Sequence, residues 1–302
     1  MKKVTLYFIT LLFAFSLNLN AQEADSTQQV TWKKSGSLNF SFANVGLSNW
    51  AAGGQNSISL GAILDLNAVR TSEKSTWENN LKIQYGMARV GKSSVNLCKK
   101  TDDSFIFTSK YGYKLNNPKW NITQILDFRS QMTGGFVYDR DSLGVEQEGD
   151  LISKFLAPGY LLLATGIEYK TKNFSLNYAP LTAKFTFVTD DALSAAGAFG
   201  VEAGKKSRSE LGSSLVSTLE FEPMENVKFK SGVTFFANYE TTSQIDVNWE
   251  TLLVFKVNKY LTTSFGTHLI YDHDILIVQE DGTSKRAIQF KNVLNVNVGF
   301  VF

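Results

Sequence analysis

The sequence predicts an all-β fold, a single transmembrane antiparallel up-and-down β-barrel of about 12 strands, within a range of about 10 to 14. Three observations support this prediction. Apolar residues recur with period two along most of the chain, the connections between these runs alternate in length, and aromatic residues gather near both ends of the runs. We therefore expect short periplasmic turns at one end of the barrel and longer extracellular loops at the other.

The N-terminus has the layout of a secretory signal peptide over residues 1–21, cleaved after Ala21. Two lysines precede an apolar run at 4–17, which is shorter than the roughly 20 residues that a spanning helix needs. An uncleaved anchor is the alternative. We expect residues 22–34 to form a short periplasmic segment and residues 35–302 to form the barrel.

Charge and cysteine content exclude several classes of protein. Cleavage would remove two of the 30 basic residues and none of the 28 acidic ones, which leaves a formally neutral chain. Neutrality gives no electrostatic basis for binding nucleic acid. Cys98 is the only cysteine, so a disulfide framework or a multi-cysteine metal site within one chain is excluded.

Each expected strand is apolar on one parity and polar on the other, as in a sheet with two different faces. Residues 151–160 fit either a strand or a connection, which accounts for the range of two strands on either side of 12. The expected strands are 38–42, 58–66, 77–87, 105–115, 120–132, 161–169, 174–188, 211–221, 227–239, 245–257, 261–271 and 288–302.

The connections are sorted by length. Short links alternate with long ones, and the brief 240–244 is the exception among the long positions. Outer-membrane barrels show this asymmetry, whereas a soluble sandwich has no reason to sort its loops. The long links are 46–56, 91–103, 134–150, 190–207 and 273–286.

The terminal strand, Ile288–Phe302, is expected to close the barrel against the first strand, because every backbone donor and acceptor in lipid needs a partner. Phe300 and Phe302 resemble the C-terminal signal that the barrel-assembly machinery reads. Aromatic residues near the turns predict a belt at the interface with outer-membrane lipid. The alternative is that they fill a soluble core. Examples of the belt are Trp77, Trp120, Phe174, Phe229 and Tyr260.

The polar parity is expected to face the lumen. One interpretation is a set of charges that pair with one another and hold the barrel rigid, and the other is a pathway for a substrate. The mixed signs indicate no ion preference, and a 12-stranded interior lies between a filled and an open one. The charged or titratable candidates are Asp65, Lys82, Asp127, Arg129, Glu168, Asp246, Glu250, Lys256 and His268.

Pro158 and Pro180 lie within expected strands, where proline is confined to edges, ends or bulges. The apolar phase also slips near Pro180, from even positions before it to odd positions after it. We therefore expect a bulge, with a bend over an inserted loop or a lateral aperture as a functional hypothesis.

The first long link predicts a loop anchor or a plug. Its Trp50 follows Asn49 and precedes a run of small residues that includes Gly53 and Gly54. Trp in such a setting favours burial, and the glycines permit close approach to the wall. The alternative is an aromatic side chain at the membrane surface. The segment Gly197–Gly204 is a second candidate for folding inward.

Catalytic, cofactor and metal sites are not expected. His268 and His273 form no HExxH-type pair, and the parity of His268 points into the lumen, unlike the lipid-facing triad of outer-membrane phospholipase A. Solvated acidic loops are favoured over Ca²⁺ sites for the remaining carboxylates, because EF-hand spacing is absent. These carboxylates are Asp139, Asp141, Asp272 and Asp274.

Several blocks, in order along the chain, resemble the exported Bacteroidota family called domain of unknown function 3078 (DUF3078). The resemblance implies an outer-membrane β-barrel without an assigned activity. The blocks are SNWAAGGQNSISLG (48–61), KKTDD (99–103), SKFLAPGY (153–160), LNYAPLTAKFTFVTDDAL (176–193), GAFGVEAG (197–204), VNWETLLVFKVNKYL (247–261) and HLIYDHD (268–274).

These observations favour a non-enzymatic, porin-like or transporter-like barrel in the outer membrane for an unidentified small solute or lipid. A structural or partner-docking barrel that acts through its outer loops is the first alternative. A membrane-embedded lipid-modifying enzyme is the second.

Overall fold

The computed structural model describes residues 30–45, 57–90, 98–140, 142, 146–241, 244–275, 277–278 and 283–302. No helix among these residues has the length and apolar character needed to cross a membrane.

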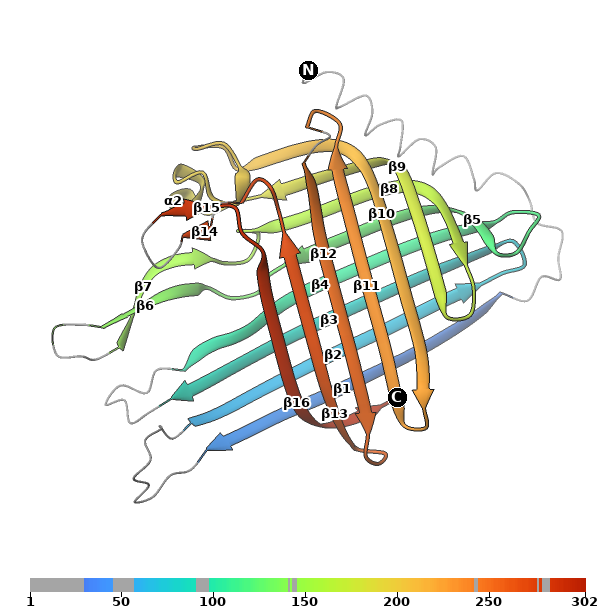
Figure 1. The fold of residues 1–302 in the computed structure, drawn as a ribbon, viewed down its shortest axis with the longest axis horizontal. Helices are drawn as coiled ribbons and strands as arrows, with labels where there is room; N and C mark the ends of the chain where they lie inside the picture. The colour runs from blue at the N-terminus through green and yellow to red at the C-terminus, as the bar shows by residue number, and fades with distance from the viewer. Residues whose placement is uncertain are drawn as a thin grey trace.

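In the described part of the chain, twelve antiparallel strands close into one barrel (Figure 1), which confirms the predicted fold class. Barrel strands that follow one another in the sequence are hydrogen-bonded neighbours, and the first strand pairs with the last. The barrel strands are β1 (Thr31–Val45), β2 (Ser57–Thr71), β3 (Ser75–Val90), β4 (Lys99–Lys114), β5 (Trp120–Ser130), β8 (Gly159–Lys170), β9 (Phe174–Phe187), β10 (Ser207–Met224), β11 (Val227–Asn238), β12 (Ile245–Lys256), β13 (Leu261–Tyr271) and β16 (Gln289–Val301).

The seam between β1 and β16 depends on the final residue. The Phe302 amide donates to the Gly36 carbonyl at 2.9 Å, and the Gly36 amide donates to the Phe302 carbonyl at 2.7 Å. A Cβ on Gly36 would lie 2.5 Å from the Phe302 ring, so the terminal ring rests where only glycine leaves room. The terminal strand is the closing strand, as predicted.

The barrel begins earlier than predicted. β1 starts at Thr31, so residues 31–34, expected in the periplasmic segment, are paired with β2. The polar parity of the first strand extends to Lys33, and pairing with the long β2 satisfies its backbone.

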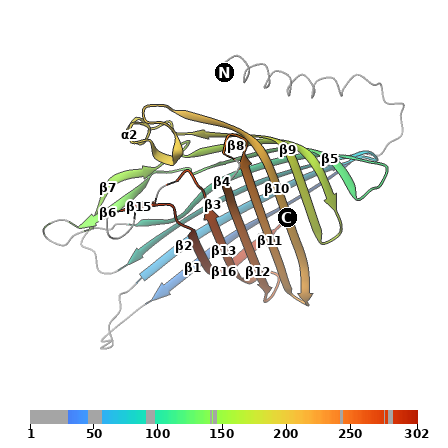
Figure 2. The same cartoon turned by 45° about the horizontal axis from the view of Figure 1, so that its top comes forward.

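The two ends of the barrel differ, as the loop lengths predicted. Tight turns join strands at one end, called here the turn end, and the remaining elements all lie at the other, the loop end (Figures 1 and 2). Within the predicted loops the structure adds short elements. These are β6 (Gly135–Arg140), β7 (Glu146–Ser153), α2 (Asp191–Ala195), η2 (Ala198–Gly200), β14 (Ile277–Val278) and β15 (Ser284–Lys285).

The outward parity is apolar and exposed. Phe42 is 60% exposed and Leu294 is 69% exposed, in a band that continues around the barrel. Monomeric soluble proteins rarely expose apolar patches this large, whereas a membrane-spanning barrel requires them. At the turn end, aromatic residues form a belt with ring centroids 5.1–6.1 Å apart. Trp32 of β1 packs against Trp77 of β3 across β2, and the other pairs are Trp120–Tyr169, Phe221–Phe229 and Tyr260–Phe300.

The ladder is irregular at Pro180. The register of β9 shifts against β8 between Thr165 and Ile167, and against β10 between Gly212 and Ser214. Because proline has no N–H to donate, the extra residue falls where the ladder loses one bond. This shift also explains why the apolar phase changes along β9.

The wall is closed at this bulge, contrary to the hypothesis of an aperture. Ala179 and Thr182 are fully buried, and Ser214 is 3% exposed. The Tyr239 hydroxyl donates to the carbonyl of Pro180, so the carbonyl freed by the bulge has a partner.

Pro158 does not lie within a strand, contrary to the expectation. It follows a tight turn in which Lys154 and Ala157 exchange backbone hydrogen bonds, and β8 begins only at Gly159. Its lack of an N–H therefore costs the barrel ladder nothing.

Two lumen-facing glycines differ in the space around them, which predicts different responses to one added methyl group. A Cβ on Gly212 would lie 2.1 Å from the Ala237 carbonyl oxygen, whereas a Cβ on Gly232 would meet no atom within 4 Å. Gly212→Ala is expected to lower the free energy of unfolding by about 1–3 kcal/mol, and Gly232→Ala to change it by less than about 0.5 kcal/mol. Denaturant titration of the refolded variants in detergent measures this, and equal effects would contradict the packing described.

Candidate functional site

The inward parity can be followed from strand to strand through the register. Asp65 lies opposite Lys82, Lys82 opposite Ile106, and Ile106 opposite Arg129. On the other wall, Glu250 lies opposite His268, and His268 opposite Lys291. All nine predicted lumen residues fall on this inward face, and the structure divides them among three levels.

In the middle level, side chains from opposite walls meet. The Arg129 Nε donates to Asp127 Oδ1 at 2.7 Å, and the Arg129 Nη1 lies 3.7 Å from Glu250 Oε1. Four strands separate β5 from β12 on one side of the barrel and six on the other, so this ion pair spans the interior. His268 Nε2 lies 3.6 Å from the same Glu250 oxygen and 3.1 Å from Asn248 Oδ1. We call Asp127, Arg129, Glu250 and His268 the lumen bridge.

Asp65 and Lys82 lie opposite each other but form no ion pair. The carboxylate of Asp65 instead accepts hydrogen bonds from Asn67 Nδ2 at 2.7 Å and Asn80 Nδ2 at 2.8 Å. Within the described residues, the ammonium group of Lys82 is left facing the interior without a carboxylate partner.

Near the turn end, Glu168 belongs to a second cluster. Lys110 Nζ lies 2.9 Å from Glu168 and 3.1 Å from Glu78, and Lys170 Nζ lies 2.5 Å from Glu78. A cavity of about 30 Å³ adjoins these side chains, which is room for about one water molecule. The cluster holds β3, β4 and β8 together on their inner face. Lys256 lies at the very end of β12, exposed and apart from this cluster.

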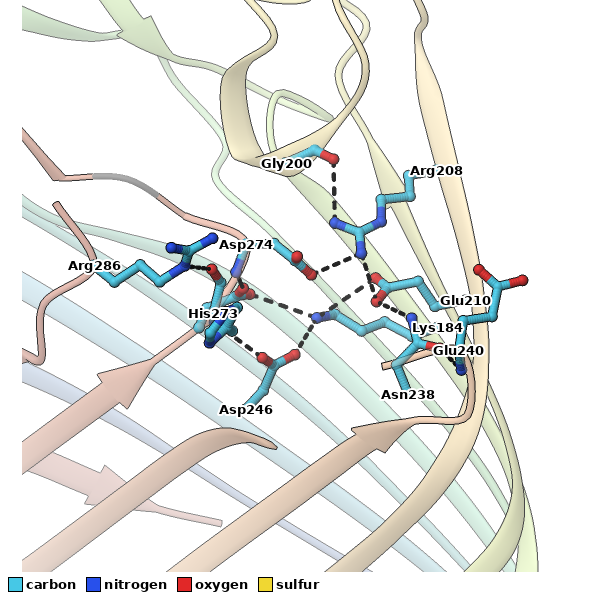
Figure 3. Close-up of polar contacts among 11 residues, drawn as sticks. Lys184, Gly200, Arg208, Glu210, Asn238, Glu240, Asp246, His273, Asp274 and Arg286 are labelled. Carbon is cyan, nitrogen blue, oxygen red and sulfur yellow. Dashed lines mark hydrogen bonds and ion pairs between the residues drawn. The ribbon is translucent and has the colours of Figure 1, made fainter. Parts of the chain in front are cut away.

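At the loop end, an ionic cluster ties the mouth of the barrel together (Figure 3). Lys184 of β9 lies 2.7 Å from Asp246, 3.5 Å from Asp272 and 3.8 Å from Glu210. Arg208 of β10 lies 2.7 Å from Asp274 and 3.1 Å from Glu210, and it donates to the Gly200 carbonyl. The mouth network consists of Lys184, Arg208, Glu210, Asp246, Asp272 and Asp274.

The mouth network corrects the expectation for the acidic loop after β13. Asp272 and Asp274 are not solvated loop carboxylates, because each reaches a cation across the opening. Asp272 lies 3.5 Å from Lys184 of β9, and Asp274 lies 2.7 Å from Arg208 of β10 (Figure 3). Strands β10, β11 and β12 lie between β13 and β9 in the wall. The segment after β13 is therefore folded over the mouth and held there by charge.

Structured loops cover the mouth beside this network. Ala157, Val188 and Val201 form a small buried core, with Leu193 and Phe199 packed against it. Asp190 caps α2 by accepting from the amides of Ala192 and Leu193, and Lys154 lies 2.6 Å from its carboxylate. The hydrogen bond from Lys154 lowers the pKa of Asp190 below its usual value, together with those two amides.

Gly197–Gly204 belongs to this cover. Gly197 has a φ of 67°, which permits the sharp change of direction between α2 and η2. The carbonyl of Gly200 then reaches Arg208, so this segment rests against the mouth network.

The interior is filled on one side and open on the other. On the side of β5, β8, β9 and β10, Thr123 and Thr182 are fully buried, and Asn177 is 4% exposed. On the side of β11, β12 and β13, a side chain added to Gly232 would enter empty space, and Leu252 is 40% exposed. Gly232 lies opposite Glu250, so the open space adjoins the lumen bridge.

The sequence identified the members of the lumen bridge but not the cations of the mouth network. Lys184 and Arg208 were not among the predicted lumen residues, nor was Glu210. A signal for Lys184 was present, because the phase slip at Pro180 places Lys184 on the inward parity between the outward Ala183 and Phe185. The distances that join Lys184 to Asp272 depend on loop folding, which no local pattern shows.

Some predicted features lie outside the described residues. These include the whole candidate anchor or plug, namely Asn49, Trp50, Gly53 and Gly54, and also Asp141. Cys98 is described, and it is exposed with a free thiol.

The chain resembles known proteins in two respects. Residues 42–136 match the family described as "Protein of unknown function (DUF3078)". This match confirms the predicted resemblance over that segment. A comparison with curated proteins finds no match.

Solved structures of similar shape include three channel proteins. The COG4313 outer membrane channel from Pseudomonas putida F1 is 12% identical, with 94% of this chain and 98% of that chain covered, at a TM-score of 0.41. The CymD monoaromatic hydrocarbon channel is 10% identical to this protein, with 91% of this chain and 88% of that chain covered, at a TM-score of 0.32. The outer membrane channel DcaP of Acinetobacter baumannii is 8% identical, with 93% of this chain and 99% of that chain covered, at a TM-score of 0.28.

The mouth network makes a prediction about stability. Lys184→Met removes the cation that faces three carboxylates, of which Glu210 has only 4% of its side chain exposed. We expect a loss of about 3–5 kcal/mol in the free energy of unfolding, because buried charges lose their partner. Denaturant titration in detergent micelles measures it.

The matched control is Lys205→Met, since Lys205 pairs with Glu202 on the surface, with 62% and 71% of the two side chains exposed. Exposed pairs contribute about 0–1 kcal/mol, so this variant should unfold almost as the parent does. Similar losses in the two variants would show that the mouth network is not a buried, coupled cluster.

Proposed function

We propose that this protein is a porin-like barrel of the outer membrane that provides a narrow, water-filled passage for a small solute. The observation that carries the proposal is the lumen bridge beside unfilled space. The Arg129–Glu250 pair crosses the interior at 3.7 Å, and a side chain on the neighbouring Gly232 would meet nothing within 4 Å. A barrel built only for rigidity has no need of such a space, because small barrels are filled by side chains.

The polarity of the lumen supports passage of hydrated solutes. Arg129 and Glu250 keep 35% and 46% of their side-chain surface exposed, and both face the interior rather than the lipid. Channels derive their selectivity and gating from charged side chains that line a constriction of the pore. The lumen bridge is thus the proposed constriction, and the covered mouth is the proposed gate.

The outer-membrane location is supported by the closed barrel with its apolar exterior and paired aromatic belt. The N-terminal signal-peptide pattern of residues 1–21 is consistent with export. Assembly through the C-terminal Phe300 and Phe302 remains part of this proposal.

The position of His268 does not favour the rival enzymatic function. Its Nε2 faces Asn248 and Glu250 in the lumen, whereas a lipid hydrolase of the phospholipase type needs its histidine beside a serine on the lipid face. The docking alternative is favoured by one observation, the structured cover at the loop end with its own buried core.

Single-channel recording of the refolded protein in planar bilayers tests the proposed function. We expect discrete conductance steps. Arg129→Ala is expected to raise the conductance because it removes one half of the lumen bridge, and Gly232→Trp is expected to lower it because the indole enters the open space without a backbone clash.

Heat-modifiable migration on gels and circular dichroism show whether each variant is folded. Folded protein that stays closed under all voltages, for the parent and for Arg129→Ala alike, would contradict the channel and favour docking. Equal conductance in Gly232→Trp and the parent would place the pathway elsewhere.

A further inference from the structure

The formal neutrality of the chain conceals a separation of charge along the barrel axis. Sorting the inward-facing residues by their distance from the turn end shows it. Within five residues of that end, the barrel strands carry seven basic and four acidic side chains on the inward parity. The basic ones are Lys33, Lys110, Lys114, Lys170, Lys228, Lys230 and Lys256, and the acidic ones are Glu78, Glu168, Glu220 and Glu222.

Toward the loop end the balance is reversed. Five basic residues face eight acidic ones when the segment after β13 is included. The basic residues are Lys82, Arg129, Lys184, Arg208 and Lys291, and the acidic residues are Asp65, Asp102, Asp127, Glu210, Asp246, Glu250, Asp272 and Asp274. Most of these are engaged in ion pairs, so the fields at this end largely cancel.

The basic excess at the turn end is accessible to water. Lys228 and Lys230 keep 50% and 55% of their side-chain surface exposed, although both lie near Glu220, at 2.6 Å and 3.9 Å. One carboxylate cannot neutralise two ammonium groups. Lys33 and Lys256 are exposed, and among the described residues Lys114 donates to the backbone carbonyls of Ser72 and Glu73. We call Lys33, Lys114, Lys228, Lys230 and Lys256 the basic vestibule.

We infer that the basic vestibule makes the passage selective for anions, and that its solutes are small organic anions bearing carboxylate or phosphate groups. This inference rests on the proposed function and names the class of solute. Clefts lined by one sign of charge between low-dielectric walls concentrate ions of the opposite sign. Ammonium groups on flexible stems suit compact oxyanions, which they contact as point charges without fixed geometry.

The field also reaches the constriction from the same direction. Lys291 lies opposite His268 in the register, and Arg129 Nη1 lies 3.7 Å from Glu250 Oε1. Lys82, on the inward face of β3, has no ion-pair partner among the described residues. An anion that leaves the basic vestibule therefore meets cationic groups beside Glu250, whereas a cation must first pass the vestibule.

The test is the reversal potential in a gradient of potassium chloride across a planar bilayer. Its sign depends on the permeability ratio of chloride to potassium and not on which way the protein inserts. The parent is expected to prefer chloride. The variant Lys228→Glu, Lys230→Glu, Lys256→Glu is expected to shift the reversal potential until its sign changes. The neutral variant Lys228→Gln, Lys230→Gln, Lys256→Gln should shift the reversal potential in the same direction by a smaller amount. This neutral variant provides the test if the triple glutamate variant does not fold.

Neighbouring lysines on opposite faces of β1 provide the matched control. Lys33 has the inward parity and Lys34 the outward one, and both are exposed. Lys33→Glu is expected to shift the reversal potential toward potassium, whereas Lys34→Glu, with the same change in charge, should leave it unchanged. Potassium succinate, added as a probe, is expected to reduce the chloride current of the parent, and this block should be lost in the triple variants.

The outcomes separate this inference from the function on which it rests. Folded parent protein without any conductance would overturn the channel itself. A conducting parent that prefers potassium, or lumen variants whose reversal potential does not move, would overturn the anion preference and leave the channel in place. Equal shifts in Lys33→Glu and Lys34→Glu would show that surface charge rather than the basic vestibule sets the preference.

Discussion

Backbone hydrogen bonding in hydrocarbon is the constraint on which the rest of this structure depends. An open edge would leave a row of N–H and C=O groups without water, at a cost of several kcal/mol for each. The chain meets this constraint at the β1–β16 seam, where Gly36 and Phe302 exchange backbone hydrogen bonds. Because the ring of Phe302 lies over Gly36, the last residue of the chain also packs against the strand that it closes.

Closing the sheet into a barrel determines how much space lies inside it. A ring of twelve strands encloses more space than side chains of average size fill, and this barrel fills it unevenly. Small buried polar residues fill the interior on the side of β8, β9 and β10, beside the bulge at Pro180. Gly232 and the exposed Leu252 leave space along the neighbouring strands β11 and β12. The unfilled space therefore lies toward β11, β12 and β13.

Charge pairing takes different forms along this passage. At the mouth, Lys184 and Arg208 are surrounded by four carboxylates, and the pairs join elements that are distant in the wall. Near the turn end, lysines outnumber their partners and are exposed to water. Paired charges hold the loop segment in place, whereas unpaired ones produce a field that acts on ions. The loop end thus carries a cover held by paired charges, and the turn end carries the proposed basic vestibule.

The sequence alone determined the fold class, the twelve strands, the sorted loops and the face on which the nine candidate lumen residues lie. These follow from a period of two residues, because parity is a local property that survives any twist of the sheet. It also located the irregularity at Pro180, since a phase slip in apolar residues is visible along the chain. It misplaced Pro158, because a tight turn of four residues beside a strand has no periodic signature.

Only the tertiary structure decided which charges meet. Arg129 and Glu250 come from β5 and β12, and Lys184 and Asp272 from β9 and the loop after β13. Their encounters depend on how far the barrel flattens and where a loop folds over its mouth. These distances are set by how the whole ring of strands closes. A local stretch of the sequence therefore cannot predict them.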